Sequence, residues 1–270
     1  MCACACVCVC VCVCAHSDMC DVQDIRNGTQ IGRCTGHFVA ADWVMTAGHC
    51  WPRIPYKYAI VHVVYGCVDI ADTACKFTVS TYLFRHPCRV SFGYTESGID
   101  VMMLRVVPSA WTASLMPLPF ASIHSLFERN ASLATVVELW GVGFGNINDV
   151  QNSRFLLAAQ LELIEQPISG IILSQHSFYF HTPLLLRSHT RNQSMCSGDS
   201  GGPLVALFPN GTMYSVGLFT AGRGNCSFTD EFAYFAYVGH SAYIQWITDV
   251  MQGVYDLSCH SYSRLPTAIS

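Results

Sequence analysis

The stretch CSGDSGGPL at residues 196–204 decides how this sequence is interpreted. It places Ser200 in a glycine-rich bend, directly ahead of an apolar run that begins at Pro203. Glycines let the backbone turn so tightly that successive amide groups can converge on one point. We therefore expect Ser200 to be a nucleophile and the amides of Gly198 and Ser200 to hold the oxyanion of a tetrahedral intermediate.

Two further segments supply the groups that such a serine needs. TAGHC at residues 46–50 places His49 just after an apolar strand, and IDVMML at residues 99–104 places Asp100 at the entrance to another. A serine hydroxyl needs a base at neutral pH, histidine has a suitable pKa, and a buried acid fixes the histidine tautomer. Each segment alone has an ordinary structural interpretation. Together, and in the chain order histidine, aspartate, serine, the three segments predict a catalytic triad of His49, Asp100 and Ser200.

The three motifs resemble those of the chymotrypsin/trypsin-like serine protease family, peptidase family S1: TA(A/G)HC, a DIALL-like segment and CxGDSGGP. The resemblance extends over residues 31–251 and includes WGVG at residues 140–143 and SVGLFTAG at residues 215–222. It implies an all-β fold of two perpendicular six-stranded antiparallel β-barrels with a C-terminal helix. It also implies a serine endopeptidase that works through an acyl-enzyme, with the triad in the cleft between the barrels.

The hydrophobic pattern independently favours an all-β chain. Short β-branched and aromatic runs alternate with turn residues, which is typical of sandwiches and barrels. The predicted strands are 38–46, 58–65, 77–84, 101–107, 134–140, 156–164, 203–208 and 214–220. Apolar residues at helical spacing predict one amphipathic helix over residues 240–251.

The 16 cysteines divide into two groups. Seven lie in a strict alternation over residues 2–14, and nine are dispersed, which suits disulfides, an oxidising compartment and a secreted protein. The resemblance implies the pairs Cys34–Cys50 and Cys196–Cys226. Cys67 and Cys75 are close enough in sequence to close a loop. The pairing of the remaining dispersed cysteines stays open: Cys20, Cys88 and Cys259.

The composition argues against several other classes of protein. The net charge of −4 is too small for a nucleic-acid footprint. After the N-terminus no apolar window reaches the roughly 18 residues that a spanning helix needs. The cysteines lack the spacing of a zinc site, so we expect no metal and no organic cofactor. The expected partners are protein or peptide substrates and protein protease inhibitors, and the expected state is a monomer.

Residues 1–20 are set apart as a low-complexity Cys/Val/Ala segment. One interpretation is the apolar core of a signal peptide, with small residues before a cleavage site. The other is a translated TG dinucleotide repeat that belongs to an incorrect gene assembly. Residues 21–251 then form the protease domain and residues 252–270 a polar tail.

The start of the domain departs from the family pattern. In the family a freed N-terminal amine pairs with the aspartate before the nucleophile, here Asp199. Ile25-Arg26-Asn27-Gly28 resembles such a start, but Asp24 precedes it and too little chain separates it from Cys34 for a complete first strand. Without the amine, Asp199 is a buried charge that needs another partner, because unpaired buried charges are costly.

The primary specificity pocket follows from the resemblance. Ser194 stands at the position of the pocket floor, where an aspartate would select Arg or Lys, so trypsin-like specificity is disfavoured. Gly222 leaves one wall of the pocket open. The other wall lies within residues 232–236. A phenylalanine at that wall would favour small substrate side chains, and an alanine would favour large apolar ones. Thr220 stands where a serine usually supports the catalytic aspartate. We expect chymotrypsin-like or elastase-like specificity.

Two alternatives remain open at this level. One is a non-catalytic protease homologue that acts as a binding module. The other is an inactive truncated product that lacks the N-terminal strand of the family.

Overall fold

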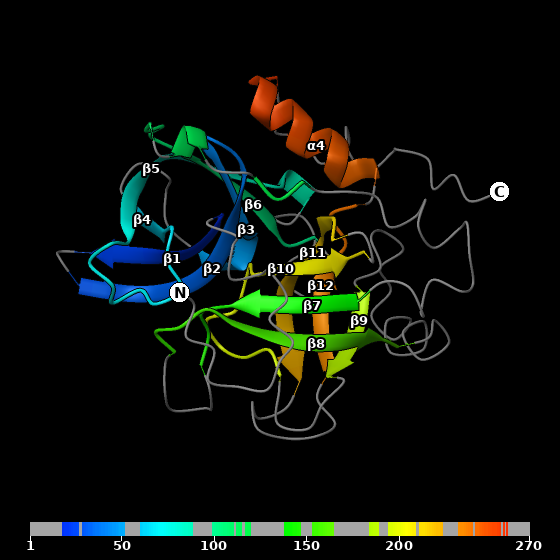
Figure 1. Ribbon diagram of the computed structural model, residues 1–270. Coiled ribbons are helices and arrows are strands. Elements are labelled where there is room, and N and C mark those ends of the chain that lie inside the picture. The colour runs from blue at the N-terminus through cyan, green and yellow to red at the C-terminus, as the bar shows by residue number, and fades with distance from the viewer. Residues whose placement is uncertain are drawn as a thin grey trace.

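The computed structural model describes residues 18–26, 29–51, 60–88, 99–110, 112–114, 117–119, 138–146, 153–164, 184–188, 194–208, 211–223, 232–239, 241–254, 256 and 258. They form two closed antiparallel barrels of six strands each, followed by one C-terminal helix (Figure 1). The predicted fold class is therefore confirmed.

The first barrel has the strand order β1-β2-β3-β6-β5-β4. Its strands are β1 (Met19–Arg26), β2 (Thr29–Ala40), β3 (Trp43–Ala47), β4 (Ile60–Tyr65), β5 (Lys76–Arg85) and β6 (Val101–Val106). A short 3-10 turn, η2 (Gly48–Cys50), follows β3, and a second, η4 (Thr112–Ser114), follows β6.

The second barrel has the strand order β10-β11-β12-β9-β8-β7. Its strands are β7 (Glu138–Gly143), β8 (Leu157–Leu163), β9 (Leu184–Ser188), β10 (Pro203–Leu207), β11 (Met213–Arg223) and β12 (Phe232–Ala236). The helix α4 (Ser241–Gln252) lies within one residue of the predicted range at each end.

Each barrel encloses its own apolar core, and two further clusters join the parts. Alternate residues of the strands point inward, such as Val22, Phe38 and Val44 in the first barrel. On one side, Tyr243 and Trp246 of α4 pack with Met45 and Met103 of the first barrel and with residues of the second. On the other, Met19 packs with second-barrel residues such as Val142 and Phe144. The two barrels are therefore held in a fixed relation around the junction that carries the predicted site.

The first strand corrects the view of the N-terminus taken from sequence. β1 begins at Met19, inside the segment that had been set apart, and pairs along its length with β2 and β4. Ile25 and Arg26 belong to the end of this strand and pair with Gln30 and Thr29 of β2, so they are not a mature N-terminus. The alternative of a product without its N-terminal strand is therefore not favoured.

The predicted strand over residues 38–46 also differs from the structure. It is two strands, β2 and β3, which pair with Phe38 opposite Val44 across a turn at Ala41 and Asp42. Aspartate favours turns because its side chain can bond its own backbone. Because apolar residues lie on both sides of Asp42, the sequence pattern predicted one continuous strand and missed the turn.

Two of the predicted disulfides are confirmed, Cys34–Cys50 and Cys67–Cys75. Cys88 and Cys196 are also disulfide-bonded, whereas Cys20 is a free, buried thiol. Cys226, the predicted partner of Cys196, and Cys259 lie outside the described residues. Among the described residues, no helix is both long and apolar enough to cross a membrane.

Candidate active site

Strand pairing brings His49 and Asp100 together. β3 and β6 are antiparallel neighbours, with Ala47 opposite Val101. The residues just after β3 and just before β6 therefore lie at the same end of the sheet. The turn η2 begins there, and the Gly48 amide donates to the Asp100 carbonyl at 3.1 Å. The local fold thus places an imidazole beside a carboxylate that are 51 residues apart in sequence.

The Ser200 turn reaches this corner from the second barrel. The Thr35 amide of β2 donates to the Ser200 carbonyl at 2.9 Å, and the Gly201 amide donates to the Phe219 carbonyl of β11 at 2.8 Å. Gly201 has a φ of +80°, and a Cβ there would overlap the Ala47 amide of β3. Only glycine permits both this conformation and this approach. The turn is therefore pressed directly against the first barrel.

The three predicted triad residues form one continuous hydrogen-bonded chain. His49 Nδ1 lies 2.5 Å from Asp100 Oδ2, and His49 Nε2 lies 2.8 Å from Ser200 Oγ. The Asp100 side chain is 0% exposed, whereas that of His49 is 25% exposed. The acid is therefore sealed from solvent while the base stays accessible, which is the arrangement that activates a serine hydroxyl.

The amides of Gly198 and Ser200 lie in the same turn. Gly198 has a φ of +95°, and its carbonyl accepts a hydrogen bond from the Thr35 hydroxyl at 3.0 Å. Within the described part of the chain, neither amide donates a hydrogen bond to the main chain. Two unpaired amides beside a nucleophile can receive developing negative charge.

Asp199 is buried in a cradle of backbone. Its Oδ1 accepts from the Gly145 amide at 2.7 Å and its Oδ2 from the Cys196 amide at 2.8 Å. A Cβ at Gly145 would collide with this carboxylate, so the close approach requires glycine. Burial raises the pKa of Asp199 to about 6. The hydrogen bonds from the two amides and the charge of Arg33 lower this pKa, but burial has the larger effect. At neutral pH the carboxylate is therefore ionised.

Two of the predicted pocket residues, Ser194 and Gly222, both lie near the Met195 carbonyl oxygen. Ser194 donates its hydroxyl to the Met195 carbonyl at 3.1 Å. A Cβ at Gly222 would lie 3.5 Å from the Met195 carbonyl oxygen and 3.5 Å from Cζ of Phe219. A ring and a carbonyl therefore lie within van der Waals reach of the Gly222 position. The facing residue within the expected range is Ala233, which pairs with Gly222.

Thr220 does not support the acid as expected. Its hydroxyl donates to the Tyr234 carbonyl at 3.0 Å, across the β11–β12 pair. The acid is instead approached by Tyr243 of α4, which is fully buried and hydrogen-bonds with the Asp100 backbone. Burial and the Asp100 charge raise the pKa of Tyr243 well above its usual value, so its hydroxyl stays protonated. The sequence signalled Tyr243 only as an apolar position of a helix.

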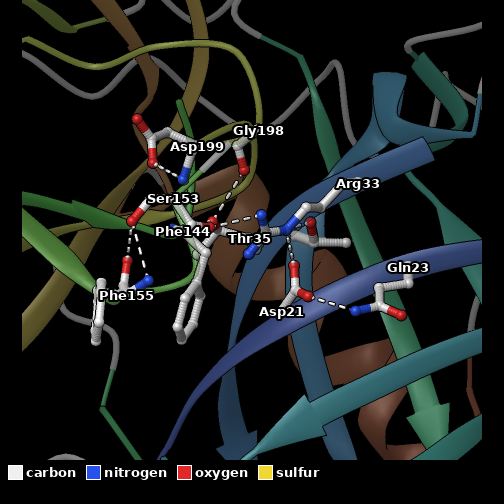
Figure 2. A network of polar contacts seen from close by, with 11 residues as sticks. Asp21, Gln23, Arg33, Thr35, Phe144, Ser153, Phe155, Gly198 and Asp199 are labelled. Carbon is white, nitrogen blue, oxygen red and sulfur yellow. Dashed lines mark hydrogen bonds and ion pairs between the residues drawn. The ribbon is translucent and has the colours of Figure 1, made fainter. Parts of the chain in front are cut away.

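Two residues of β2 were also missed by sequence reasoning. Arg33 and Thr35 flank the disulfide residue Cys34, and their side chains bond the Ser153 and Gly198 carbonyls, respectively (Figure 2). Their role depends on contacts more than 100 residues away, to Ser153 and Gly198. The only signal in the sequence was the presence of an arginine beside a cysteine of the site.

The described residues contain one group of potential metal ligands, Cys34, His49 and Cys50. The two cysteines are joined as a disulfide, so they carry no thiolate for a metal. This group therefore gives no reason to assign a metal to the site.

Comparison with known proteins places the chain in one family. Residues 16–247 match the family described as Trypsin. The chain is 28% identical over 232 residues to human chymotrypsin-like elastase family member 1, covering 83% of each. It is 25% identical over 235 residues to snake venom serine protease ussurase of Gloydius ussuriensis, covering 84% of this chain and 89% of that one.

Vitamin K-dependent protein C of Mus musculus is 24% identical over 216 residues. This match covers 79% of the chain described here and 45% of protein C, so the chain spans less than half the length of that relative. Because the family match covers most of the sequence, the chain belongs to the trypsin family of serine proteases.

Proposed function

We propose that this chain is a serine endopeptidase that hydrolyses peptide bonds of protein or peptide substrates through an acyl-enzyme. The observation that carries the proposal is the unbroken chain from Asp100 Oδ2 through the His49 imidazole to Ser200 Oγ, at 2.5 and 2.8 Å. Both are hydrogen-bonding distances, and the one between His49 Nε2 and Ser200 Oγ lies within reach for proton transfer.

In the first half of the proposed reaction, Ser200 Oγ attacks the carbonyl carbon of the substrate and its proton passes to His49 Nε2. The carbonyl oxygen becomes an oxyanion, which the amides of Gly198 and Ser200 bind. Asp100 holds the imidazole in the tautomer with Nδ1 protonated and stabilises the imidazolium. The carbon–nitrogen bond then breaks, the amine leaves with the proton from Nε2, and an ester to Ser200 remains.

In the second half, water replaces the amine. His49 Nε2 removes a proton from the water as its oxygen attacks the ester carbon, and the same two amides bind the second oxyanion. Collapse of this intermediate breaks the bond to Ser200 Oγ, which regains its proton from His49. The products are the two peptide fragments and unchanged enzyme.

For specificity, we propose that the primary pocket takes small uncharged side chains. Ser194 offers no charge to an Arg or Lys side chain, and the Phe219 ring and Met195 carbonyl lie close to Gly222. A side chain much longer than that of alanine or valine would meet these groups. This proposal favours the elastase-like branch of the expectation. Ala233 faces Gly222, and an alanine there would by itself leave room for large apolar side chains. We therefore propose that the Phe219 ring, and not the residue at 233, limits the size of the side chain that fits.

The activity is tested with a fluorophosphonate probe on the full chain and on Ser200→Ala. We expect stoichiometric labelling of the native protein and none of the variant, because labelling needs an activated hydroxyl. A folded native protein that does not label, with near-ultraviolet circular dichroism showing intact tertiary packing, would identify a non-catalytic homologue and overturn the proposal.

The specificity is tested with peptide amides that differ only in the residue before the cleaved bond. We expect kcat/KM to be highest for alanine and to be lower for phenylalanine and lysine. Phe219→Val should raise kcat/KM for the phenylalanine substrate by about 10-fold or more, since it opens space worth several methylene groups. Phe208→Val, at a second aromatic pair of the same barrel, is the matched control and should leave the ranking unchanged.

We also propose that the protein is secreted. Cys34–Cys50 and Cys67–Cys75 are formed, and two further cysteines are disulfide-bonded. Such bonds persist in oxidising compartments and are rare in the cytosol. Immunodetection of the natural protein in the medium of cells that express it checks this assignment.

A further inference from the structure

A network of polar contacts runs from the first barrel to the Ser200 turn (Figure 2). Arg33 of β2 starts it: its Nε donates to Asp21 Oδ1 at 2.6 Å and its Nη1 donates to the Ser153 carbonyl at 2.7 Å. Gln23 donates to the other oxygen of Asp21 at 2.6 Å. The guanidinium is thereby fixed in direction by Asp21 of β1 and by the Ser153 carbonyl ahead of β8.

From Ser153 the network continues to Asp199 in two steps. The Ser153 amide donates to the Gly145 carbonyl at 3.2 Å, and the Gly145 amide donates to Asp199 Oδ1 at 2.7 Å. Arg33 is therefore connected to the Asp199 carboxylate through two backbone segments. Any displacement of the guanidinium moves the group that holds this carboxylate.

Thr35 forms a parallel connection from the same face of β2. Its hydroxyl donates to the Gly198 carbonyl at 3.0 Å and accepts from the Phe144 amide at 3.0 Å. Residues two apart on a strand point to the same side. β2 thus contacts the Ser200 turn at Gly198 and, through Arg33, at Asp199.

The charges in this network are almost completely buried. Asp21 is 0% exposed at its side chain and Arg33 is 10% exposed. Nη2 of Arg33 is buried and has no hydrogen-bond partner in the described part of the chain. The Asp21 carboxylate pairs with the guanidinium at Nε. The two charges form a buried dipole, whose positive end is the far side of the guanidinium. Arg33 is also the charged group that lowers the pKa of Asp199 against the effect of burial.

We propose that Arg33 is a positioning residue, which holds Asp199 and the oxyanion-binding amides in place from β2 and supplies the positive charge that Asp199 needs. The role rests on the proposed peptidase function. In this proposal Arg33 supplies the positive charge for Asp199 that a freed N-terminal amine supplies in the family. We expect activity of this chain to depend on Arg33.

The two kinds of cation differ in how they respond to pH. An α-amino group has a pKa of about 8, whereas a guanidinium stays charged above pH 12. The groups that face Asp199 from the surrounding elements are the Gly145 and Cys196 amides and the Arg33 guanidinium, with Asp21 behind it. None of these loses a positive charge between pH 8 and 10. Activity held by Arg33 should therefore be constant across that range.

The experiment compares the full chain with Arg33→Met and Arg33→Lys. Arg187→Met is the matched control, since Arg187 forms an exposed ion pair with Glu162 on the far strands β8 and β9. For each protein we would measure kcat and KM with a peptide amide, and the inhibition constant of a peptide boronate that mimics the tetrahedral intermediate. Active sites are titrated with the fluorophosphonate probe.

For Arg33→Met we expect kcat and boronate affinity to fall together by about 10- to 100-fold, less than or similar to the loss of one oxyanion donor. KM should change little. Arg33→Lys should recover most of the activity at pH 8 and lose it toward pH 11, because an ammonium group has a pKa of about 10.4. The wild type and Arg187→Met should stay constant over this range.

Unchanged kcat and boronate affinity in Arg33→Met would overturn the inference while leaving the proposed function intact. So would a wild type whose activity falls through pH 8, which would identify an amine as the partner of Asp199. If Arg33→Met fails to fold, the pH profile of Arg33→Lys decides the question. A wild type that is inactive throughout overturns the proposed function, and this inference with it.

Discussion

Two buried aspartates flank the Ser200 turn, and their surroundings are opposite. Asp100 is held by the first barrel and faces the His49 imidazole, a side chain that can gain a proton. Asp199 is held by the second barrel and faces two backbone amides, Gly145 and Cys196, which cannot. The first carboxylate therefore sits beside a charge that changes during the proposed reaction. The second sits beside dipoles that stay constant.

This difference separates two tasks that buried carboxylates can have. A carboxylate beside a base stabilises the cation that forms in the transition state. A carboxylate held by amides fixes the backbone that carries those amides, and so fixes the oxyanion site. Because burial of charge is unfavourable, each carboxylate can stay ionised only if its own partners stabilise the negative charge.

The largest expected effect comes from removing the charge of Asp100. Asp100→Asn should lower kcat by about 10⁴-fold, because an amide stabilises the wrong imidazole tautomer. Folding should be retained, as judged by the thermal midpoint. Asp42→Asn, at a carboxylate 31% exposed and 3.6 Å from Arg105, is the matched control and should keep wild-type activity. A kcat within 10-fold of wild type in Asp100→Asn would contradict the role given to this acid.

A smaller effect is expected from Asp199. In Asp199→Asn one carboxylate oxygen becomes an NH₂ group, which faces a backbone amide donor and loses that hydrogen bond. We expect kcat to fall by about 100-fold, comparable to the loss of an oxyanion donor. The affinity for the peptide boronate should fall with it. If the boronate binds as tightly as to wild type, Asp199 does not position the oxyanion site.

The smallest effect is a pair of opposing contributions to stability between pH 4 and 6. Burial raises the pKa of Asp199 to about 6, so the folded state binds more protons than the unfolded state and gains stability as pH falls through this range. Burial lowers the pKa of His37 to about 3, so the folded state binds fewer protons and loses stability over the same range. Each slope is about 1.4 kcal/mol per pH unit, and the two cancel.

Single variants should reveal the two slopes. Relative to wild type, His37→Leu should become more stable as pH falls from 6 to 4, and Asp199→Asn should become less stable. Urea unfolding at pH 4, 5, 6 and 7 gives the free energies, and the double variant should again follow the wild-type pH dependence. Parallel curves for wild type and His37→Leu would show that His37 does not titrate with the lowered pKa.

Much of the fold and of the candidate site could be predicted from local patterns. Short β-branched and aromatic runs bounded by turn residues predicted most strands, because these side chains pack well on a pleated sheet. The three motifs named His49, Asp100 and Ser200, and the structure brings these side chains together. The Cys67–Cys75 bridge followed from closeness in sequence alone.

What was missed depends on contacts between distant segments. β1 was not among the predicted strands; it contains Asp21 and Asp24, and Asp21 is buried and paired with Arg33. The hydroxyl of Thr220 had two possible acceptors, and the pairing of β11 with β12 decided for the Tyr234 carbonyl. In the pocket, the position of the Phe219 ring relative to Gly222 depends on packing inside the second barrel.

The sequence by itself determined which chemical groups this protein brings to its site, because the motifs carry both residue identity and order. Only the tertiary structure decided how Asp199 is held: two amides donate to it, and a guanidinium from the other barrel lowers its pKa. The physical reason is that a buried charge is stabilised by whatever lies nearby in space. That neighbourhood is set by how the two barrels pack, which no local stretch of sequence encodes.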